Sequence, residues 1–202
     1  MLQRRVVSRT LLALSLVGAW AVLSGCGQDK PAFKGVDITG ADYAQGFALS
    51  DQDGQVRTLK DFAGKAVVVF FGFTQCPDVC PTALQEIAQA KQLLGADGAK
   101  LQGIFITVDP ERDTPKLLKA YVANFGADFV ALRPSLEQLP KVTKDFKIYY
   151  KKVDGKTPTS YTLDHSAGSF AFDPQGRIRL YNRHASGAET LAADVKILLS
   201  GK

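Results

Sequence analysis

The chain is poor in side chains that can act as soft ligands or nucleophiles. It has only three cysteines and two histidines among 202 residues. Any chemistry that needs a thiol or an imidazole therefore has few possible positions. Because Cys26 directly follows an N-terminal leader, Cys76 and Cys80 are the thiols left in the rest of the chain. This pair is the first candidate for the chemistry of the protein.

Other absences exclude further classes of function. The sequence has no run of lysine or arginine that could follow a phosphate backbone, no periodic repeat and no low-complexity block. The full chain has 25 basic and 20 acidic residues, and removal of Arg4, Arg5 and Arg9 with the leader leaves 22 against 20. A net charge of about +2 gives no reason to expect a nucleic-acid partner.

No apolar stretch near the N-terminus is long enough to cross a membrane. The run over residues 11–23 has about 13 residues, whereas a spanning helix needs about 20. It follows a basic segment, and this order is typical of a secretory signal. Residues 23–26 read Leu-Ser-Gly-Cys, which resembles the lipobox of bacterial lipoproteins. We therefore predict a signal peptide over residues 1–25, which would direct export of the protein by the Sec or the twin-arginine route.

The same segment predicts where the protein is located. In a lipobox the cysteine is acylated and becomes the new N-terminus, so Cys26 is the expected lipidation site. Residues 26–45 carry no sustained hydrophobic period, and we interpret them as the lipidated N-terminus and a tether, with order at most near residues 36–39. The protein is then an exported, membrane-anchored lipoprotein whose domain lies on the periplasmic or extracytoplasmic side.

The remaining residues, 46–202, suit one folded domain with a substantial core. Residues 47–50 and 56–59 flank an Asp-Gln-Asp-Gly turn and predict an N-terminal hairpin. Later strand and helix signals alternate, which predicts an α/β domain with a central mixed sheet flanked by helices. The predicted strands are 65–73, 101–108, 129–132, 148–153 and the hairpin 169–181; the predicted helices are 82–94, 114–126, 135–146 and 188–199.

The two cysteines lie where a strand signal gives way to a helix signal. Proline follows each of them, and a residue before proline is pushed out of the helical region. We therefore predict both thiols in a tight loop, with Pro81 at the first helical position and Cys80 at or next to the cap. The helix dipole there favours a thiolate. The pair could close as a small-ring disulfide or open to bind a soft metal ion.

An inert disulfide is the first alternative, because exported proteins often carry structural disulfides. A ring of five residues would contribute only about 2 kcal/mol by loop entropy, against about 4.7 kcal/mol for a hundred-residue loop. So short a ring would do little for the fold.

A third ligand would strengthen the metal hypothesis, and the chain has two histidines. His165 lies between Asp164 and Ser166, just before the second hairpin, and from the residues alone it is as plausible a ligand as not. His184 lies between Arg183 and a small-residue loop, so an exposed loop histidine is expected there. Two thiolates and one imidazole suit copper in either oxidation state, and also zinc.

Three motifs in this order together resemble the Sco/SenC family of copper-binding assembly proteins. Residues 72–82 read Gly-Phe-Thr-Gln-Cys-Pro-Asp-Val-Cys-Pro-Thr, residues 108–115 read Val-Asp-Pro-Glu-Arg-Asp-Thr-Pro, and residues 164–166 read Asp-His-Ser. The resemblance extends over about residues 47–199, nearly all of the predicted domain.

The resemblance implies a thioredoxin-like fold that binds one copper ion, Cu(I) or Cu(II). The implied ligands are Cys76, Cys80 and His165. Many relatives have histidine at the position of Gln75; that position is not a family ligand, so the departure leaves the ligand set intact.

The resemblance also implies a function. The protein would be a metallochaperone rather than an enzyme, and it would help to mature the binuclear copper centre of cytochrome c oxidase subunit II by delivering copper or by reducing cysteines. The expected partners are the copper domain of that subunit, other periplasmic copper carriers or thiol reductants, and the membrane through the N-terminal lipid. Two alternatives use the same cysteines: a thiol-disulfide oxidoreductase and a redox or copper sensor.

Four aspartates lie in these motifs. Asp78, between the cysteines, is predicted to be a solvated residue that tunes the site or meets a partner. Asp109 ends a predicted strand and is expected near the site, because neighbouring strand ends converge there, and Asp164 could orient the histidine beside it. Asp113 is interpreted as mainly structural, at the entrance of a helix.

Overall fold

The apolar run after Lys65 forms the centre of the fold. In the computed structural model, which describes residues 32–157 and 160–201, it becomes strand β4 (Ala66–Gly72), buried at every position. β4 pairs in parallel with β5 (Leu101–Thr107), also buried throughout, and antiparallel with β9 (Ser169–Phe172). The predicted strands over residues 65–73 and 101–108 are thus confirmed, and neither alternates with polar residues, as is usual for strands covered on both faces.

These strands belong to a mixed sheet of eight strands in the order β1-β10-β9-β4-β5-β6-β2-β3. The predicted N-terminal hairpin is confirmed and extends one edge of this sheet by pairing with β6. The second predicted hairpin, β9 with β10, is also confirmed. The strands not yet given are β1 (Val36–Asp37), β2 (Ala48–Asp51), β3 (Val56–Thr58), β6 (Val130–Arg133) and β10 (Ile178–Asn182).

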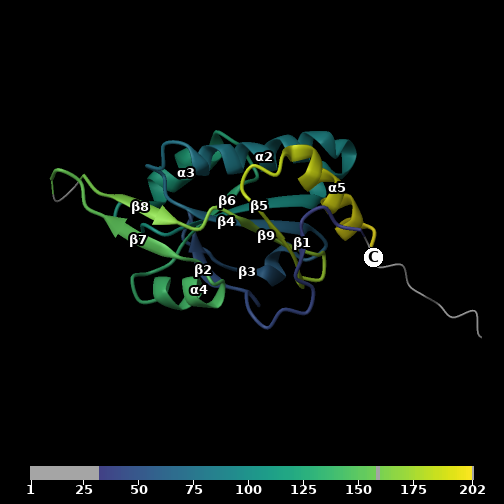
Figure 1. Ribbon diagram of the computed structural model, residues 1–202, viewed down its shortest axis with the longest axis horizontal. Coiled ribbons are helices and arrows are strands. Elements are labelled where there is room, and N and C mark those ends of the chain that lie inside the picture. Colours follow the sequence, from purple (N-terminus) through teal and green to yellow (C-terminus); the bar gives the residue numbers. More distant parts are fainter. Residues whose placement is uncertain (1–31, 158–159, 202) are drawn as a thin grey trace, which may run out of the picture. The chain divides into compact units, whose positions relative to one another are not determined.

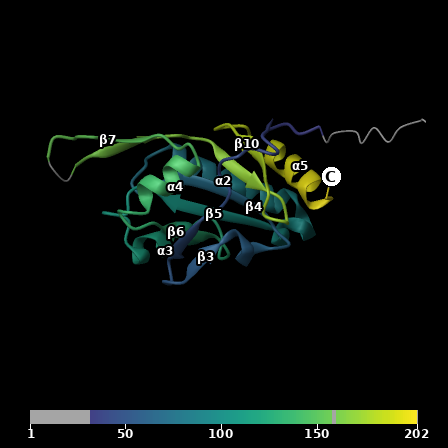
Figure 2. The ribbon, with the colours of Figure 1, turned by 90° about the horizontal axis from the view of Figure 1, so that it is seen from below.

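Helices cover both faces of the sheet (Figure 1, Figure 2). The two crossovers between parallel strands are expected to be right-handed, which places α2 (Val79–Leu93) and α3 (Pro115–Ala123) on one face. There α2 packs against α5 (Ala188–Leu199), while α4 (Leu139–Asp145) lies on the other face. The described residues also form two short 3₁₀ helices, η2 (Leu59–Phe62) and η3 (Gly95–Lys100).

The core between these layers is rich in aromatic side chains. Aromatic contacts continue from β4 to α4 and β9, with ring centroids 5.0 Å apart for Phe71 and Phe146 and 5.5 Å apart for Phe146 and Phe170. Such rings bury a large area each, and here they pack in tilted and edge-to-face pairs. The largest fully buried side chains include Phe70, Phe71, Phe73, Phe105, Phe146 and Phe172.

A second ribbon lies outside the main sheet. β7 (Tyr150–Val153) and β8 (Thr162–His165) pair only with each other and project from the domain in Figure 1. The strand β8 was not predicted. β8 has a single apolar residue, Leu163, which is too weak a pattern to predict a strand. Leu163 is also the one buried residue in the two strands. The ribbon therefore has almost no core of its own.

The prediction of a tether over residues 26–45 is wrong from Ala32 onward, where the compact unit begins. The backbone N–H groups of Lys34 and Gly35 donate to the buried carboxylate of Asp194, at 2.8 and 2.7 Å. β1 then pairs with β10, and Ala44 is fully buried. This attachment uses backbone groups, one distant carboxylate and a few scattered apolar side chains, so no sustained hydrophobic period reveals it.

The helices of the structure can be compared with the predicted ones at their first residues. The helix predicted over residues 135–146 begins only at Leu139, because a turn closed by Ser135 and Gln138 occupies its first residues. The cap predicted for α3 is confirmed: the Thr114 hydroxyl accepts from the N–H of Leu117 and proline follows at the first helical position. Within residues 32–157 and 160–201, no helix is both long and apolar enough to cross a membrane.

Candidate metal centre

The two cysteines lie at the C-terminal end of β4, where the chain turns into α2. Cys76 is half-buried in the connecting loop, and Cys80 is fully buried. The prediction that Cys80 lies outside the helix is wrong. The helix begins at Val79, so Cys80 lies in its first turn and Pro81 at the third helical position.

Proline is tolerated there for a simple reason. The first N–H groups of a helix have no partner inside it, so a missing N–H at Pro81 loses no intrahelical hydrogen bond. The first regular bond is that from the N–H of Thr82 to the carbonyl of Asp78, at 3.2 Å. The rule on residues before proline is a preference, and the packing of Cys80 under the sheet overrides it.

The sulfur of Cys80 is packed against the end of β4. A Cβ atom placed on Gly72 would lie 2.6 Å from the Cys80 Sγ and 2.9 Å from the ring of Phe105. Real side chains do not approach so closely. Glycine at this position therefore makes room for the sulfur, and this contact explains the glycine that opens the first motif.

His165 comes to the cysteines from the end of β8. Its ring lies edge-on to two rings from β4 and the following loop, with centroids 6.0 Å from Phe70 and 5.8 Å from Phe73. The Nδ1 atom lies 2.8 Å from the carbonyl oxygen of Ser166. Because a carbonyl can only accept, Nδ1 carries the proton, and in the neutral ring Nε2 keeps its lone pair. Nε2 lies 3.4 Å from the Cys80 Sγ.

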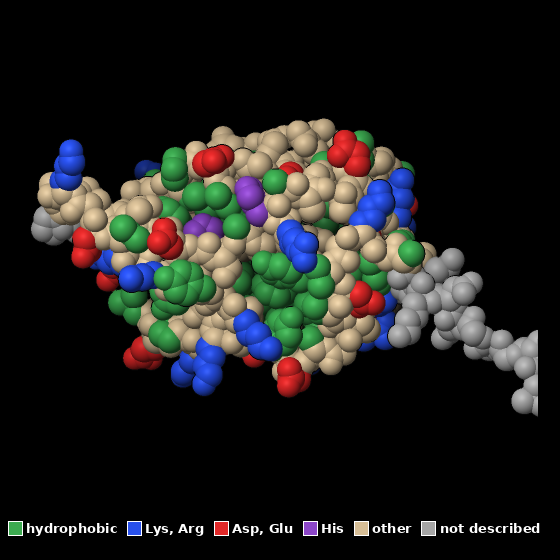
Figure 3. Space-filling model, in the orientation of Figure 1, with side chains coloured by type: hydrophobic (Ala, Val, Ile, Leu, Met, Phe, Trp, Pro, Cys, Tyr) green, Lys and Arg blue, Asp and Glu red, His purple; other side chains and the backbone are tan. Residues whose placement is uncertain are grey.

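The three potential ligand atoms of Cys76, Cys80 and His165 lie within 4.8 Å of one another. Both cysteines are free, and the N–H of Cys80 donates to the Cys76 Sγ at 3.4 Å. Histidine side chains appear among hydrophobic ones on the face shown in Figure 3. The structure thus brings together the three side chains that the sequence singled out.

The two thiols have opposite electrostatics. The hydrogen bond from the Cys80 thiol lowers the pKa of Cys76 to about 3, and hydrogen bonds from the backbone N–H groups of Cys80 and Asp78 further support the thiolate. The same interaction with Cys76, together with burial, raises the pKa of Cys80. The pair therefore holds one thiolate, at the more exposed sulfur, and keeps the buried sulfur protonated.

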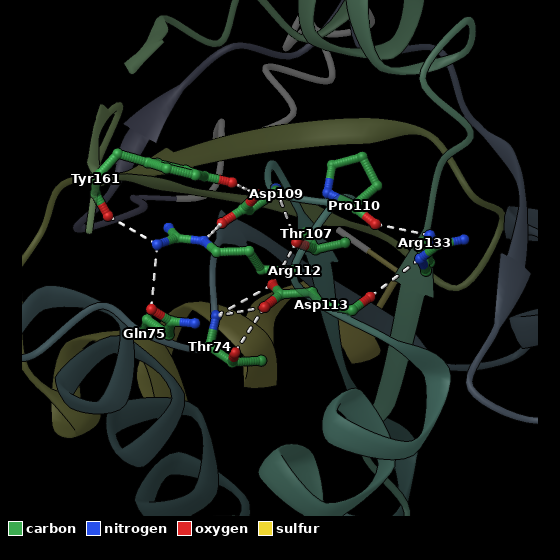
Figure 4. A network of polar contacts seen from close by, with 9 residues as sticks. All are labelled: Thr74, Gln75, Thr107, Asp109, Pro110, Arg112, Asp113, Arg133 and Tyr161. Carbon is green, nitrogen blue, oxygen red and sulfur yellow. Dashed lines mark hydrogen bonds and ion pairs between the residues drawn. The ribbon is translucent and has the colours of Figure 1, made fainter. Parts of the chain in front are cut away.

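A polar network joins this loop to the second motif and to the β7–β8 ribbon (Figure 4). Asp109 is only 4% exposed. It accepts from the Arg112 Nε and, at 2.8 Å, from the Tyr161 hydroxyl. Arg112 Nη1 also donates to the Tyr161 carbonyl at 2.7 Å and to the Gln75 Oε1 at 3.1 Å. Asp109 is thus near the site but bonds to Arg112 and Tyr161.

Asp113 holds the cysteine loop from beneath. Its carboxylate is fully buried and accepts from the Thr74 N–H at 3.1 Å, from the Thr74 hydroxyl at 2.6 Å and from the Thr107 hydroxyl at 2.5 Å. Burial raises the pKa of Asp113, and these hydrogen bonds oppose that rise. Its backbone carbonyl accepts from Arg133, which also bonds to the Pro110 carbonyl. Each contact anchors the chain, but the carboxylate binds Thr74 and Thr107 and not the entrance of α3 that the sequence suggested.

The other predicted residues have simpler surroundings. Asp78 is exposed at the N-cap of α2, and its side chain makes no capping hydrogen bond. Asp164 is exposed on β8, opposite Lys151. His184 is exposed, as expected. Cys26 and the predicted signal peptide lie outside the described residues.

Sequence reasoning missed two residues of this centre. Arg112 is part of the second motif, but of that motif only Asp109 was predicted to lie near the site. Tyr161 lies four positions before His165 and has no motif of its own. The presence of an arginine between two buried aspartates was the available signal, because a buried carboxylate usually requires a paired charge.

Two sulfurs and one imidazole nitrogen form a donor set for a soft or borderline ion. Such a set suits copper and, with a further ligand, zinc. The Nδ1 contact with the Ser166 carbonyl fits this interpretation, because a metal-binding histidine usually donates its other N–H to a carbonyl or carboxylate. The residues therefore fit a metal ion on the evidence of their own hydrogen bonds.

Comparison with known proteins is consistent with this geometry. A family model described as SCO1/SenC matches residues 36–200. The mitochondrial SCO2 homologue of Bos taurus is 33% identical over 199 residues, which cover 96% of this chain and 75% of the relative.

Solved structures give the same result. ScoI of Bradyrhizobium japonicum, solved with copper bound, is 40% identical, with a TM-score of 0.69 over 76% of this chain and 97% of that one. A SCO1/SenC family lipoprotein of Bacillus anthracis str. Ames is 26% identical, with a TM-score of 0.68 over 83% of this chain and 99% of that one. The predicted thioredoxin-like fold is confirmed by these matches and by the mixed sheet.

Proposed function

The chain belongs to the SCO1/SenC family, and we propose that it is a copper-binding metallochaperone. It assists the maturation of the binuclear copper centre of cytochrome c oxidase subunit II, by delivering copper or by reducing the cysteines of that subunit. Cys76, Cys80 and His165 bind one copper ion, Cu(I) or Cu(II). The observation that carries the proposal is the approach of their ligand atoms to within 4.8 Å of one another.

The surroundings of these atoms support copper as cargo. The hydrogen bond from Cys80 lowers the pKa of Cys76, which favours the thiolate that a metal ion requires, and the bond from Nδ1 to Ser166 leaves the lone pair of the His165 Nε2 available. Binding of the ion requires loss of the Cys80 proton. Because Cys76 is only half-buried, a partner's thiol can reach this ligand.

A thiol-disulfide reductase is the second candidate, and a specific observation favours it. A low-pKa, partly exposed Cys76 beside a protonated, buried Cys80 is the usual arrangement of an attacking thiolate and a resolving thiol. The same two sulfurs would then reduce the cysteines of the partner. A redox or copper sensor would use the same two states.

We further propose that the protein is exported and anchored to the membrane through a lipid on Cys26, with its domain on the periplasmic or extracytoplasmic side. The support is the sequence Leu-Ser-Gly-Cys after the basic and apolar leader, together with the similar lipoprotein of Bacillus anthracis. Mass spectrometry of the membrane fraction would reveal a diacylated Cys26 as the N-terminal residue, and an unmodified N-terminus elsewhere would contradict the anchor.

An anaerobic copper titration of the reduced full chain tests the function. We expect about one copper per chain, abolished in Cys76→Ser and in Cys80→Ser, because a single thiolate and one imidazole form too weak a set. The loaded protein is then mixed with the copper domain of oxidase subunit II. Transfer of metal supports delivery, transfer of electrons alone supports the reductase, and full-strength binding by either serine variant would exclude this site.

A further inference from the structure

His165 can meet the two cysteines only if the ribbon that carries it is held in place beside the cysteine loop. It lies on the β7–β8 ribbon, which pairs with no strand of the main sheet. At the base of the ribbon, Tyr149 and Ser166 exchange two hydrogen bonds, at 2.9 and 3.0 Å. These bonds join the two strands to each other. They do not fix the ribbon relative to the cysteine loop.

Apart from the contacts of the His165 ring itself, four side chains make that connection, and we call Gln75, Asp109, Arg112 and Tyr161 the arginine clamp. Within it, Tyr161 is held on three sides. The Arg112 guanidinium carbon lies 3.5 Å from the centroid of the Tyr161 ring. The same guanidinium donates to the Tyr161 carbonyl, and the Tyr161 hydroxyl donates to Asp109. The chain is therefore fixed four residues before His165 (Figure 4).

The same arginine reaches the other ligand-bearing segment. Its Nη1 donates to Gln75, the residue directly before Cys76. Its guanidinium carbon also lies 5.9 Å from the centroid of the Phe73 ring, which in turn contacts the His165 ring edge-on. One guanidinium thus contacts both the cysteine loop and the strand that carries the histidine.

Only arginine can make this set of contacts. The guanidinium is planar and has five donors in a fixed fork, so it can stack on a ring while it bonds to three acceptors in its own plane. The ion pair is well shielded, with the Arg112 side chain 15% exposed and that of Asp109 4% exposed. A lysine would keep the charge but could not stack and bond in these directions.

We propose that the arginine clamp positions His165 over Cys76 and Cys80 and thereby sets how tightly the site holds Cu(II) relative to Cu(I). This inference rests on the proposed function, since it takes His165 as a copper ligand. Two thiolates alone suit soft Cu(I), whereas Cu(II) depends more on the imidazole nitrogen. A loosened clamp therefore weakens Cu(II) binding more than Cu(I) binding, and Arg112 and Tyr161 are positioning residues rather than ligands.

Two variants test the clamp, with one matched control. Arg112→Lys keeps the charge and removes the fork, whereas Tyr161→Phe keeps the ring and removes only the bond to Asp109. The control is Arg177→Lys. Arg177 makes the same type of ion pair, Nε to a buried aspartate at 2.7 Å, but in the turn between β9 and β10.

The first readout is copper affinity. We expect Arg112→Lys to weaken Cu(II) binding by about 10- to 100-fold, the usual effect of losing a contact that orients a ligand, and to change Cu(I) binding several-fold less. Absorption and paramagnetic resonance spectra of the Cu(II) form should shift toward a site without imidazole. Tyr161→Phe should do the same to a smaller extent, and Arg177→Lys should match the wild type. A folded Arg112→Lys or Tyr161→Phe with wild-type Cu(II) affinity and spectrum would overturn the inference.

The second readout needs no metal and separates the two proposals. Amide hydrogen exchange of the copper-free protein over residues 161–165 should be faster in both clamp variants and unchanged in the control. If exchange responds but wild-type protein binds no copper, the proposed function fails while the clamp stands as a device that holds the ribbon. If exchange does not respond, the clamp fails whatever the copper affinity. Should Arg112→Lys not fold, Tyr161→Phe decides.

Discussion

The two C-terminal hairpins of this domain are built in opposite ways. The β9–β10 hairpin lies inside the main sheet, between β4 and β1, and most of its strand residues are buried. The β7–β8 ribbon pairs with no other strand, and Leu163 is its one buried strand residue. Yet the exposed ribbon carries His165. The β9–β10 hairpin contributes to the hydrophobic core, whereas the β7–β8 ribbon carries a candidate ligand.

The difference shows how the two hairpins are held. A ladder of backbone hydrogen bonds and ring packing fixes β9–β10, so its position depends on the whole core. The ribbon depends on a few side chains, above all Arg112 and Tyr161. Segments with little buried surface open locally at low free-energy cost. A ligand on such a segment can leave the metal without unfolding the domain.

The largest expected contrast is in stability. Phe172→Ala in β9 removes a fully buried ring that contacts Phe146, and we expect a loss of about 3–5 kcal/mol in the free energy of unfolding. Val153→Ala in β7, where the residue is 38% exposed, should cost much less, about 1 kcal/mol or below. Urea unfolding of the reduced, metal-free proteins measures both. Similar losses would show that the two hairpins contribute equally.

The joint between the hairpins should be the next most sensitive point. A Cβ atom on Gly168, between β8 and β9, would overlap the ring of Tyr181. Gly168→Ala should therefore cost about 1–3 kcal/mol by overpacking. The double variant Gly168→Ala, Tyr181→Leu tests the cause. In the Tyr181→Leu background the overlap is relieved, so Gly168→Ala should cost less free energy of unfolding there than in the wild type. Strictly additive effects would contradict the overlap.

The two histidines sharpen the comparison, since each follows or ends one hairpin. His165→Ala should weaken Cu(II) binding by at least about tenfold, or about 1.4 kcal/mol, and abolish the spectral signature of imidazole. His184→Ala, just after β10, should bind copper as the wild type does, because His184 is exposed and does not belong to the ligand cluster. Titration of both variants decides; a larger effect at His184 would remove His165 from the site.

The smallest effect is expected on the outer side of the ribbon. The Lys152 ammonium lies 3.9 Å from the centroid of the Tyr161 ring, on a strand that is exposed. Lys152→Ala should lower the free energy of unfolding by less than about 1 kcal/mol, the range of an exposed cation–π contact. It should also leave Cu(II) affinity unchanged. A clear loss of copper affinity would mean that Lys152, and not Arg112 alone, holds the ribbon.

Sequence alone predicted the parts of the fold that depend on local patterns. The unbroken apolar runs gave β4 and β5, and the spacing of leucines and valines gave α5. It failed where distant partners decide the structure. The chain before residue 46 is held by Asp194, about 160 positions away in sequence, and β8 has too few apolar residues to stand out from a loop.

The candidate site shows the same division. Residue type and spacing were enough to single out Cys76 and Cys80, because few thiols exist in the chain, whereas His165 was assigned as a ligand through the family resemblance. The backbone around Cys80 was predicted wrongly, since the local preference of the residue before Pro81 gave way to burial of the sulfur. Arg112 was missed because its role depends on contacts with Tyr161, 49 positions away.

The unequal burial of the two sulfurs imposes an order of events. An incoming thiol or disulfide meets Cys76 first, because the sulfur of Cys80 is enclosed between α2 and the bare backbone of Gly72. With a partner disulfide, the Cys76 sulfur would attack one partner sulfur and form a mixed disulfide while the other partner sulfur leaves as a thiolate. Cys80 would then attack Cys76, closing the Cys76–Cys80 disulfide and releasing the second partner sulfur. Partners can therefore react with the site only through Cys76. The absence of a side chain at Gly72 is what allows the Cys80 sulfur to stay buried.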